Sequence, residues 1–176
     1  MESRVKLLGH PLHAMLTDFP AALFTVTVLF DVIGLISGDR QFATVSWWAL
    51  SAGLLFGLAA ALFGLIDWIG IRSGTRAKRI GMWHGLGNLG VVILFAASWW
   101  LRMSAPGYAP PGFAVVLGVV AIGIALVTLW LGGELVFRLR IGVDDDANAD
   151  APSSLAPREA APDTARRGRS RPARLT

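Results

Sequence analysis

The sequence predicts an all-α fold, a four-helix transmembrane bundle with up-down-up-down topology. Hydrophobic residues make up 54% of the 176 residues and charged residues only 16%, whereas an average soluble domain has about 25% charged residues. The apolar residues gather in four runs, each close to or above the ~20 residues that cross about 30 Å of hydrocarbon. The connections between the runs are short, which makes neighbouring helices antiparallel.

The four predicted spans follow one another through residues 1–143, which we expect to form one membrane domain. The predicted helices are 19–36, 43–69, 81–101 and 113–137. The connections 37–42, 70–80 and 103–112 contain turn-forming Gly, Ser and Pro residues. The first run is longer than the apolar part of a usual secretory signal, and no clear small-residue cleavage site follows it, so we expect a retained helix.

Basic residues near the spans predict the orientation, because a basic loop tends to stay in the cytoplasm. One side of the membrane has two of these residues, Arg40 and Arg102. The other side has Arg4, Lys6, Arg72, Arg76, Lys78, Arg79, Arg138 and Arg140. We therefore expect a plasma membrane protein with both termini in the cytoplasm.

The segment 144–176 is rich in Asp, Ala, Pro, Ser and Arg and poor in bulky apolar residues, which predicts a disordered polar and basic tail. Its arginines either contact anionic lipid or are simply solvated. The absence of cysteine excludes disulfides, thiolate metal sites and cysteine nucleophiles. Because the basic residues lie in short loops and the tail, the predicted partner is the lipid bilayer and not nucleic acid.

The polar residues of the predicted domain converge at the cytoplasmic ends of the helices, because alternating helix directions bring early positions of one helix level with late positions of the next. His84 and Asn88 share a helix face. Asp67 continues a stripe of small residues from Gly53 to Gly64, so we expect its side chain to point into the bundle. The candidate cofactor-binding or ion-binding residues are His10, His13, Asp18, Asp67, His84, Asn88 and Glu134.

These candidate residues form one polar layer at the cytoplasmic ends of the helices, and three interpretations of this layer remain open. Two imidazoles from different helices are suited to hold a haem iron axially, and histidines with carboxylates are suited to a divalent metal. Alternatively, Asp67, His84 and Glu134 relay protons or bind an ion. In the structural interpretation, Asp18 caps the first helix before Pro20, and the other two carboxylates pair with nearby basic residues.

The tryptophans favour an aromatic belt at the membrane–water interfaces. Trp47 and Trp48 begin the second predicted span, and Trp99 and Trp100 end the third. We expect these four at the outer interface.

Several motifs also resemble an uncharacterised bacterial membrane family, domain of unknown function 2231. The similarity covers residues 9–143 and includes Asp31, Asp67 and His84 within the spans. Its opening and closing motifs are Gly9-His10-Pro11-Leu12-His13-Ala14-Met15-Leu16, Phe19-Pro20, Gly132-Gly133-Glu134-Leu135-Val136-Phe137 and Ile141-Gly142-Val143. Ala14 stands where a second proline is usual and Asp18 where a further histidine is common, which weakens an all-histidine metal site.

The resemblance implies a compact four-helix module, with relatives that are associated with redox partners; a membrane redox partner or a homo-oligomer is expected. The sequence has no Ser-His-Asp arrangement, phosphate loop or dinucleotide fingerprint, which favours a non-enzymatic role. The leading hypothesis is a small membrane module that binds a cofactor, metal or ion. The alternative is a structural or accessory subunit without a cofactor.

Overall fold

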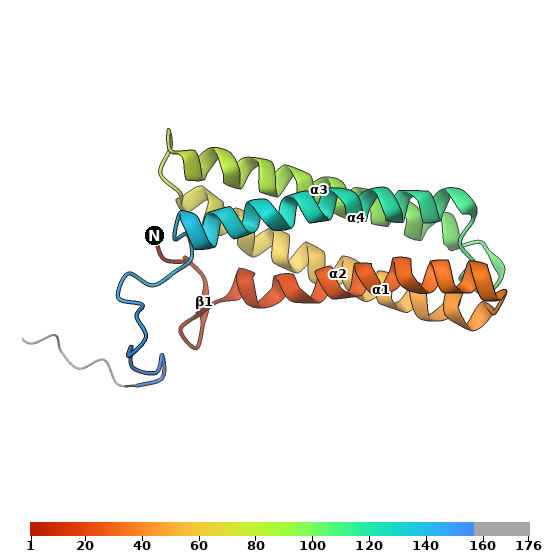
Figure 1. Cartoon of the computed structure of the whole chain (residues 1–176), viewed down its shortest axis with the longest axis horizontal. Coiled ribbons are helices and arrows are strands. Elements are labelled where there is room, and N and C mark those ends of the chain that lie inside the picture. The colour runs from red at the N-terminus through yellow and green to blue at the C-terminus, as the bar shows by residue number, and fades with distance from the viewer. Residues whose placement is uncertain (157–176) are drawn as a thin grey trace, which may run out of the picture.

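The computed structural model describes residues 1–156 as two antiparallel helical hairpins packed into a four-helix bundle (Figure 1). The helices are α1 (Leu12–Ser37), α2 (Arg40–Gly70), α3 (Arg76–Arg102) and α4 (Gly112–Gly133). A short 3₁₀ turn, η1 (Pro106–Tyr108), precedes α4, and a π-helical segment, η2 (Glu134–Arg138), follows it. All four helices are long and apolar enough to cross a membrane. The predicted fold class is confirmed.

The bundle has two different ends. Both the N-terminal segment and the chain after α4 lie at the end that also contains the α2–α3 connection (Figure 1). We name this the terminal end. The α1–α2 and α3–α4 connections lie at the opposite end, which we name the far end.

Gly, Asp and Thr residues in the connections end one helix and cap the next. Gly38 ends α1 in the left-handed conformation at φ 71°, which glycine adopts without steric cost. Asp39 caps α2 by accepting a hydrogen bond from the Gln41 amide at 2.9 Å, and Thr75 caps α3 by accepting one from the Lys78 amide at 3.1 Å. These caps define the short connections.

The first helix begins at Leu12 and not at Phe19, because a small hairpin directs the chain into it. The strands β1 (Lys6–Leu7) and β2 (His10–Pro11) pair antiparallel. Leu8 and Gly9 between them have positive φ angles of 51° and 87°, as a two-residue hairpin turn requires.

The interpretation of Asp18 as the cap of the first helix is therefore wrong. Pro11 holds the capping position, and Pro20 lies inside α1. A proline there removes one backbone hydrogen bond, and α1 continues because its buried face packs along the whole length of α2. Asp18 is an exposed residue within α1.

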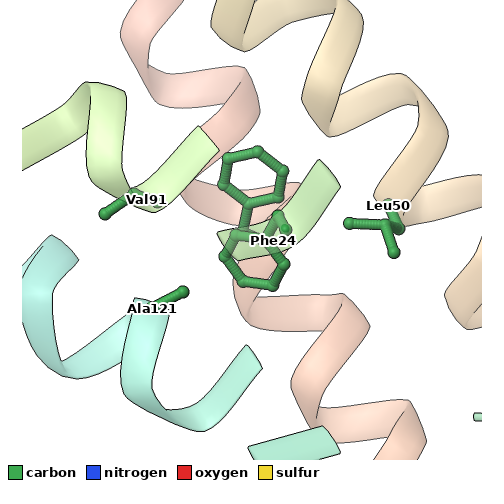
Figure 2. Packing of buried hydrophobic residues seen from close by; sticks show 5 residues of the cluster. Phe24, Leu50, Val91 and Ala121 are labelled. Atoms are coloured by element: carbon green, nitrogen blue, oxygen red, sulfur yellow. The ribbon is translucent and has the colours of Figure 1, made fainter. Parts of the chain in front are cut away.

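The core lies midway along the bundle, where all four helices contribute (Figure 2). Phe24 of α1 stacks on Phe95 of α3 with ring centres 4.1 Å apart. Leu50, Val91 and Ala121 complete the buried cluster. A Cβ atom at Gly53 would lie 2.7 Å from the Phe24 ring, so the small residues of α2 let α1 approach closely, as the sequence predicts.

The tryptophan pairs divide between the outside and the inside of the bundle. Trp48 and Trp100 are 65% and 70% exposed, as an aromatic belt requires. Trp47 is only 7% exposed and stacks on Trp99 at 4.9 Å and on Tyr108 at 4.4 Å. The belt assignment is wrong for Trp47 and Trp99, because consecutive helical residues point about 100° apart and only one of each pair faces outward.

The chain after η2 runs back over the terminal end. Residues 139–156 form turns, with no helix or strand among them. Residues 157–176, which include most of the predicted tail, lie outside the described part of the chain.

Candidate functional site

Two histidines from different hairpins meet near the terminal end. His13 lies in the first turn of α1, and His84 lies on α3. Their ring centres are 6.5 Å apart and their planes are nearly perpendicular, at 88°. Both helices start at the terminal end, so these two early positions have similar depths in the bundle. The convergence of these two residues is as the sequence predicts.

Each imidazole is oriented by a backbone carbonyl of the neighbouring helix. His13 Nδ1 lies 2.8 Å from the Ala60 carbonyl oxygen, and His84 Nδ1 lies 2.8 Å from the Thr128 carbonyl oxygen. A carbonyl only accepts, so Nδ1 is the protonated nitrogen in both rings. In a neutral ring with this tautomer, the lone pair is on Nε2.

Glycines make room for both rings. A Cβ atom at Gly64 of α2 would lie 2.6 Å from His13 Cε1, and one at Gly132 of α4 would lie 3.1 Å from His84 Cε1. The first distance is too short for any larger residue without movement of the ring. Each histidine is thus held against the second helix of its own hairpin.

Asn88 extends the network around His84. Its Nδ2 donates to the His84 carbonyl oxygen at 2.9 Å and lies 3.2 Å from His84 Nε2. Its Oδ1 accepts from the Thr128 hydroxyl at 3.0 Å. The same threonine therefore contacts His84 through its carbonyl and Asn88 through its hydroxyl.

Asp67 is occupied by the N-terminal segment. The Ser3 hydroxyl donates to both carboxylate oxygens at 2.9 Å and 2.7 Å, and the Arg4 amide donates to Oδ1 at 2.7 Å. These hydrogen bonds attach the chain start to the last turns of α2. Among the described residues, no basic side chain forms an ion pair with this carboxylate.

Glu134 joins α3 to the end of α4. It pairs with Arg76 at 2.6 Å and lies 3.9 Å from Arg138 Nε, as the structural interpretation of the sequence expects. Its side chain is 15% exposed.

The two remaining candidates are at the surface. His10 is exposed, and its Nε2 lies 3.4 Å from the Ser154 hydroxyl. Asp18 is exposed on α1, and no described residue forms a hydrogen bond or ion pair with its side chain. The structure does not bring either residue to the His13–His84 pair.

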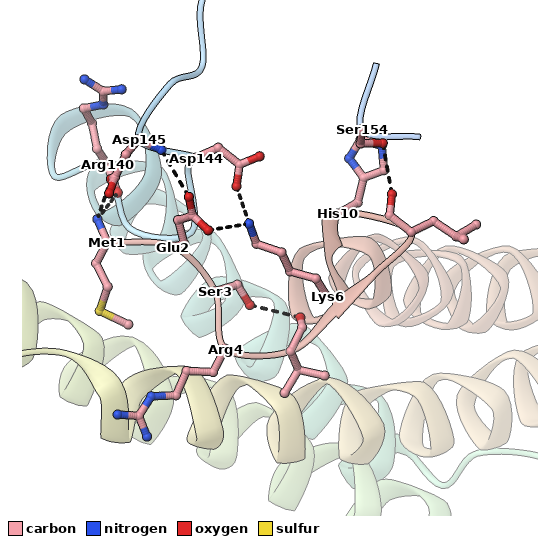
Figure 3. Close-up of polar contacts among 12 residues, drawn as sticks. Met1, Glu2, Ser3, Arg4, Lys6, His10, Arg140, Asp144, Asp145 and Ser154 are labelled. Atoms are coloured by element: carbon pink, nitrogen blue, oxygen red, sulfur yellow. Dashed lines mark hydrogen bonds and ion pairs between the residues drawn. The ribbon is translucent and has the colours of Figure 1, made fainter. Parts of the chain in front are cut away.

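The N-terminal segment and the chain after η2 clasp each other over the terminal end (Figure 3). The Lys6 ammonium pairs with Glu2 at 2.8 Å and with Asp144. The Gly142 amide donates to the Met1 carbonyl oxygen at 2.9 Å. These contacts join the two segments at the terminal end.

The contacts between Lys6 and Glu2 shift the pKa of both groups toward their charged forms. The hydrogen bond from Lys6 holds the pKa of the Glu2 carboxyl below its usual range. Hydrogen bonds to Asp144 and then to Glu2 raise the pKa of the Lys6 ammonium. Both groups are thus charged at neutral pH.

A buried ion pair at the far end was not predicted from the sequence. Arg102 and Asp31 are 0% and 1% exposed. The guanidinium donates to the carboxylate through Nη1 at 2.8 Å and Nη2 at 2.6 Å. The hydroxyls of Ser46 and Ser98 each accept from Arg102 at 2.9 Å. Three helices meet in this network.

A sequence signal for this pair did exist. Asp31 is an isolated carboxylate deep in an apolar run, and such a group needs a cationic partner. Arg102 directly follows the third predicted span on the same side of the membrane, and its position there resembles that of a loop charge. Matching the depth of the two charges would have suggested the pair.

The geometry limits the metal chemistry of the described residues. They contain no group of three or more His, Cys, Asp or Glu side chains that could hold a metal ion. The His13–His84 pair offers two nitrogen ligands. A carboxylate–histidine cage for a divalent metal is not formed by the described side chains.

Comparison with known proteins gives one match. A family model described as a predicted membrane protein (DUF2231) matches residues 9–145 of this chain. No curated protein and no solved structure matches it.

Proposed function

The chain belongs to the DUF2231 family of predicted membrane proteins, and we propose that it is a membrane-embedded haem-binding module whose axial ligands are His13 and His84. The observation that carries this proposal is the pair of imidazoles with centres 6.5 Å apart. Two imidazoles that would share one metal ion have ring centres on the order of 6 Å apart. A histidine from each hairpin supplies one ligand.

The hydrogen bonds of both rings support this role. Histidine ligands usually donate their second ring nitrogen to a carbonyl or carboxylate, which fixes the tautomer and the ring orientation. Nδ1 of His13 and of His84 has such a carbonyl partner at 2.8 Å. Nε2 would then hold the iron, and at His84 the iron would replace the contact of Nε2 with Asn88 Nδ2 at 3.2 Å.

The number of ligands favours haem over a bare metal ion. A structural or catalytic zinc ion takes three or four protein ligands, and the described residues hold no such group. Haem takes only axial ligands from the protein, and its apolar macrocycle suits the interior of a membrane bundle. The cofactor supplies one-electron chemistry, which implies a redox partner in or at the membrane.

The visible spectrum of the purified protein tests the proposal. The full chain is expressed with haem supply, purified in detergent and measured for absorbance and iron content. We expect a haem spectrum in the wild type. His13→Ala and His84→Ala should each lower haem content at least about tenfold, because each removes a direct ligand.

The third histidine provides a matched control. His10→Ala removes the same type of side chain from the same end of the bundle but should keep the spectrum, because the His10 ring is exposed and its hydrogen-bond partner in the described part of the chain is Ser154. A colourless wild type, or an unchanged spectrum in both ligand variants, would exclude the proposal. The protein would then be a structural or accessory subunit.

The contacts of Asp67 and Glu134 favour that alternative as the second candidate. Ser3 and Arg4 bind Asp67, and Arg76 pairs with Glu134. Both carboxylates therefore tie segments together. In this role the polar layer fixes helix register, and the chain assembles with another protein or with a second copy of itself.

We also propose that the terminal end faces the cytoplasm of a bacterial cell and that the bundle resides in the plasma membrane. The support is the excess of basic residues at this end. The burial of Arg102 strengthens this charge difference between the two ends. Among the described residues, Arg40 is then the one exposed basic residue of the far end.

A further inference from the structure

A pocket on the outer side of the terminal end is separate from the histidine pair. It has a volume of about 480 Å³ and is lined by Arg76, Trp130, Glu134 and Arg138. We name it the arginine pocket. It lies between the first turn of α3 and the end of α4 with η2. We propose that it binds the phosphate headgroup of an anionic phospholipid, independently of any haem.

The charges of the pocket fit a phosphate. Two guanidinium groups face one carboxylate, which leaves an excess positive charge. Arg76 uses Nη2 for Glu134 at 2.6 Å, whereas Arg138 Nε lies 3.9 Å from the same carboxylate, beyond hydrogen-bond distance. Each guanidinium has five N–H donors, so most donors remain available. Planar guanidinium groups bind phosphate oxygens in pairs.

Glu134 pairs closely with Arg76 and is less exposed than either arginine of the pocket. Its side chain is 15% exposed, whereas Arg76 and Arg138 are 55% and 77% exposed. The Leu139 amide donates to the Glu134 carbonyl oxygen at 3.1 Å across the π turn. Such widened turns are frequent at functional sites. The cations are therefore the groups that an incoming headgroup meets first.

The position of the pocket favours a lipid over a free anion. Arg76 begins one candidate span and Arg138 ends another, so both lie at a membrane boundary. Trp130, about two turns before Arg138, is 64% exposed, and the nearby Leu129 and Val127 are 66% and 60% exposed. Tryptophan is typical of the level just below the headgroups. A ligand with a phosphate next to an apolar chain matches both parts of the site, and basic pockets of this kind bind anionic lipids.

Lipid binding to the full chain in detergent micelles tests the proposal. Titration with phosphatidylglycerol, followed by native mass spectrometry, should show tighter binding than titration with zwitterionic phosphatidylcholine. The double variant Arg76→Gln/Arg138→Gln should weaken phosphatidylglycerol binding on the order of 30-fold. The control Arg72→Gln/Arg79→Gln removes the same charge from exposed residues of the same end and should keep most of the binding.

Glu134→Gln provides a variant with the opposite sign. It removes the carboxylate from the arginine pocket and should tighten phosphatidylglycerol binding, which cannot result from misfolding. Equal binding of both lipids, equal loss in the control, or unchanged binding in Glu134→Gln would overturn the proposal. Displacement of phosphatidylglycerol by inorganic phosphate at equal concentration would also overturn it, because the site would then recognise the free anion.

Discussion

At the scale of single residues, the buried ion pair between Asp31 and Arg102 is the main polar interaction inside the bundle. A charged group removed from water is costly unless it is paired and hydrogen-bonded. The two guanidinium–carboxylate hydrogen bonds and the hydroxyls of Ser46 and Ser98 meet most of this need. Arg102 Nε is the buried side-chain donor that no described residue satisfies. Ser98 also donates to the Ala114 carbonyl oxygen at 2.9 Å, so the network connects all four helices at the far end.

Removal of one partner should therefore be costly. We expect Asp31→Asn and Arg102→Gln each to lower the free energy of unfolding by about 3–5 kcal/mol, because the remaining charge stays buried without its partner. The double variant Asp31→Leu/Arg102→Met should recover much of this loss, since two apolar residues leave no unpaired charge. Unfolding of the purified variants in detergent measures the effect.

An exposed carboxylate near the same end is the control. Asp39→Asn keeps a good capping side chain for α2 and should change stability by less than about 0.5 kcal/mol. If a single Asp31 or Arg102 variant also stayed within that range, the ion pair would contribute little to folding.

At the scale of helices, glycine positions decide how closely each hairpin packs. Gly64 of α2 lies against the His13 ring, where a Cβ atom would be 2.6 Å from Cε1. Gly85 of α3 has no atom within 4 Å of such a Cβ position. Both residues are glycines, but their environments differ. Substitutions at the two positions therefore separate the effect of packing from the effect of helix propensity.

Alanine substitutions at these two glycines should have opposite effects. Gly64→Ala forces His13 to move and should cost about 1–3 kcal/mol while lowering haem content. Gly85→Ala adds a methyl group in open space and should stabilise the helix by about 0.5–1 kcal/mol. Thermal unfolding and the visible spectrum measure both changes. Equal stability of the two variants would contradict the close contact of Gly64 with the His13 ring.

At the scale of the whole molecule, the two ends differ in chemistry. The terminal end has the clasp, the histidine pair and most of the basic residues. The far end has the stacked rings of Trp47, Trp99 and Tyr108 next to the buried ion pair. An asymmetric bundle of this kind should insert in one orientation.

Reporter fusions test the orientation. Fusions after Ile36, Arg76, Pro110 and Val143 should report outside, inside, outside and inside, because short basic loops resist translocation. Each fusion is made with two reporters, one active in the cytoplasm and one active outside it, so that either location gives a positive signal. A translocated fusion at Val143 would reverse the proposed topology.

The sequence by itself determined the number of helices and their antiparallel order. Hydropathy and chain direction are properties of successive residues, and they suffice to bring His13 level with His84 and Glu134 level with Arg76. The start of α1 was misplaced because Pro20 suggests a helix boundary, whereas the hairpin at Leu8 and Gly9 brings the chain into the helix earlier.

Only the tertiary structure decided which side chains face one another. Trp47 faces the interior, Ser3 donates to both carboxylate oxygens of Asp67, and Arg102 pairs with Asp31. Each outcome depends on the rotation of a helix about its own axis, which close packing against its neighbours sets. A nearly uniform apolar sequence carries little information about that rotation, because almost every face of such a helix is compatible with lipid.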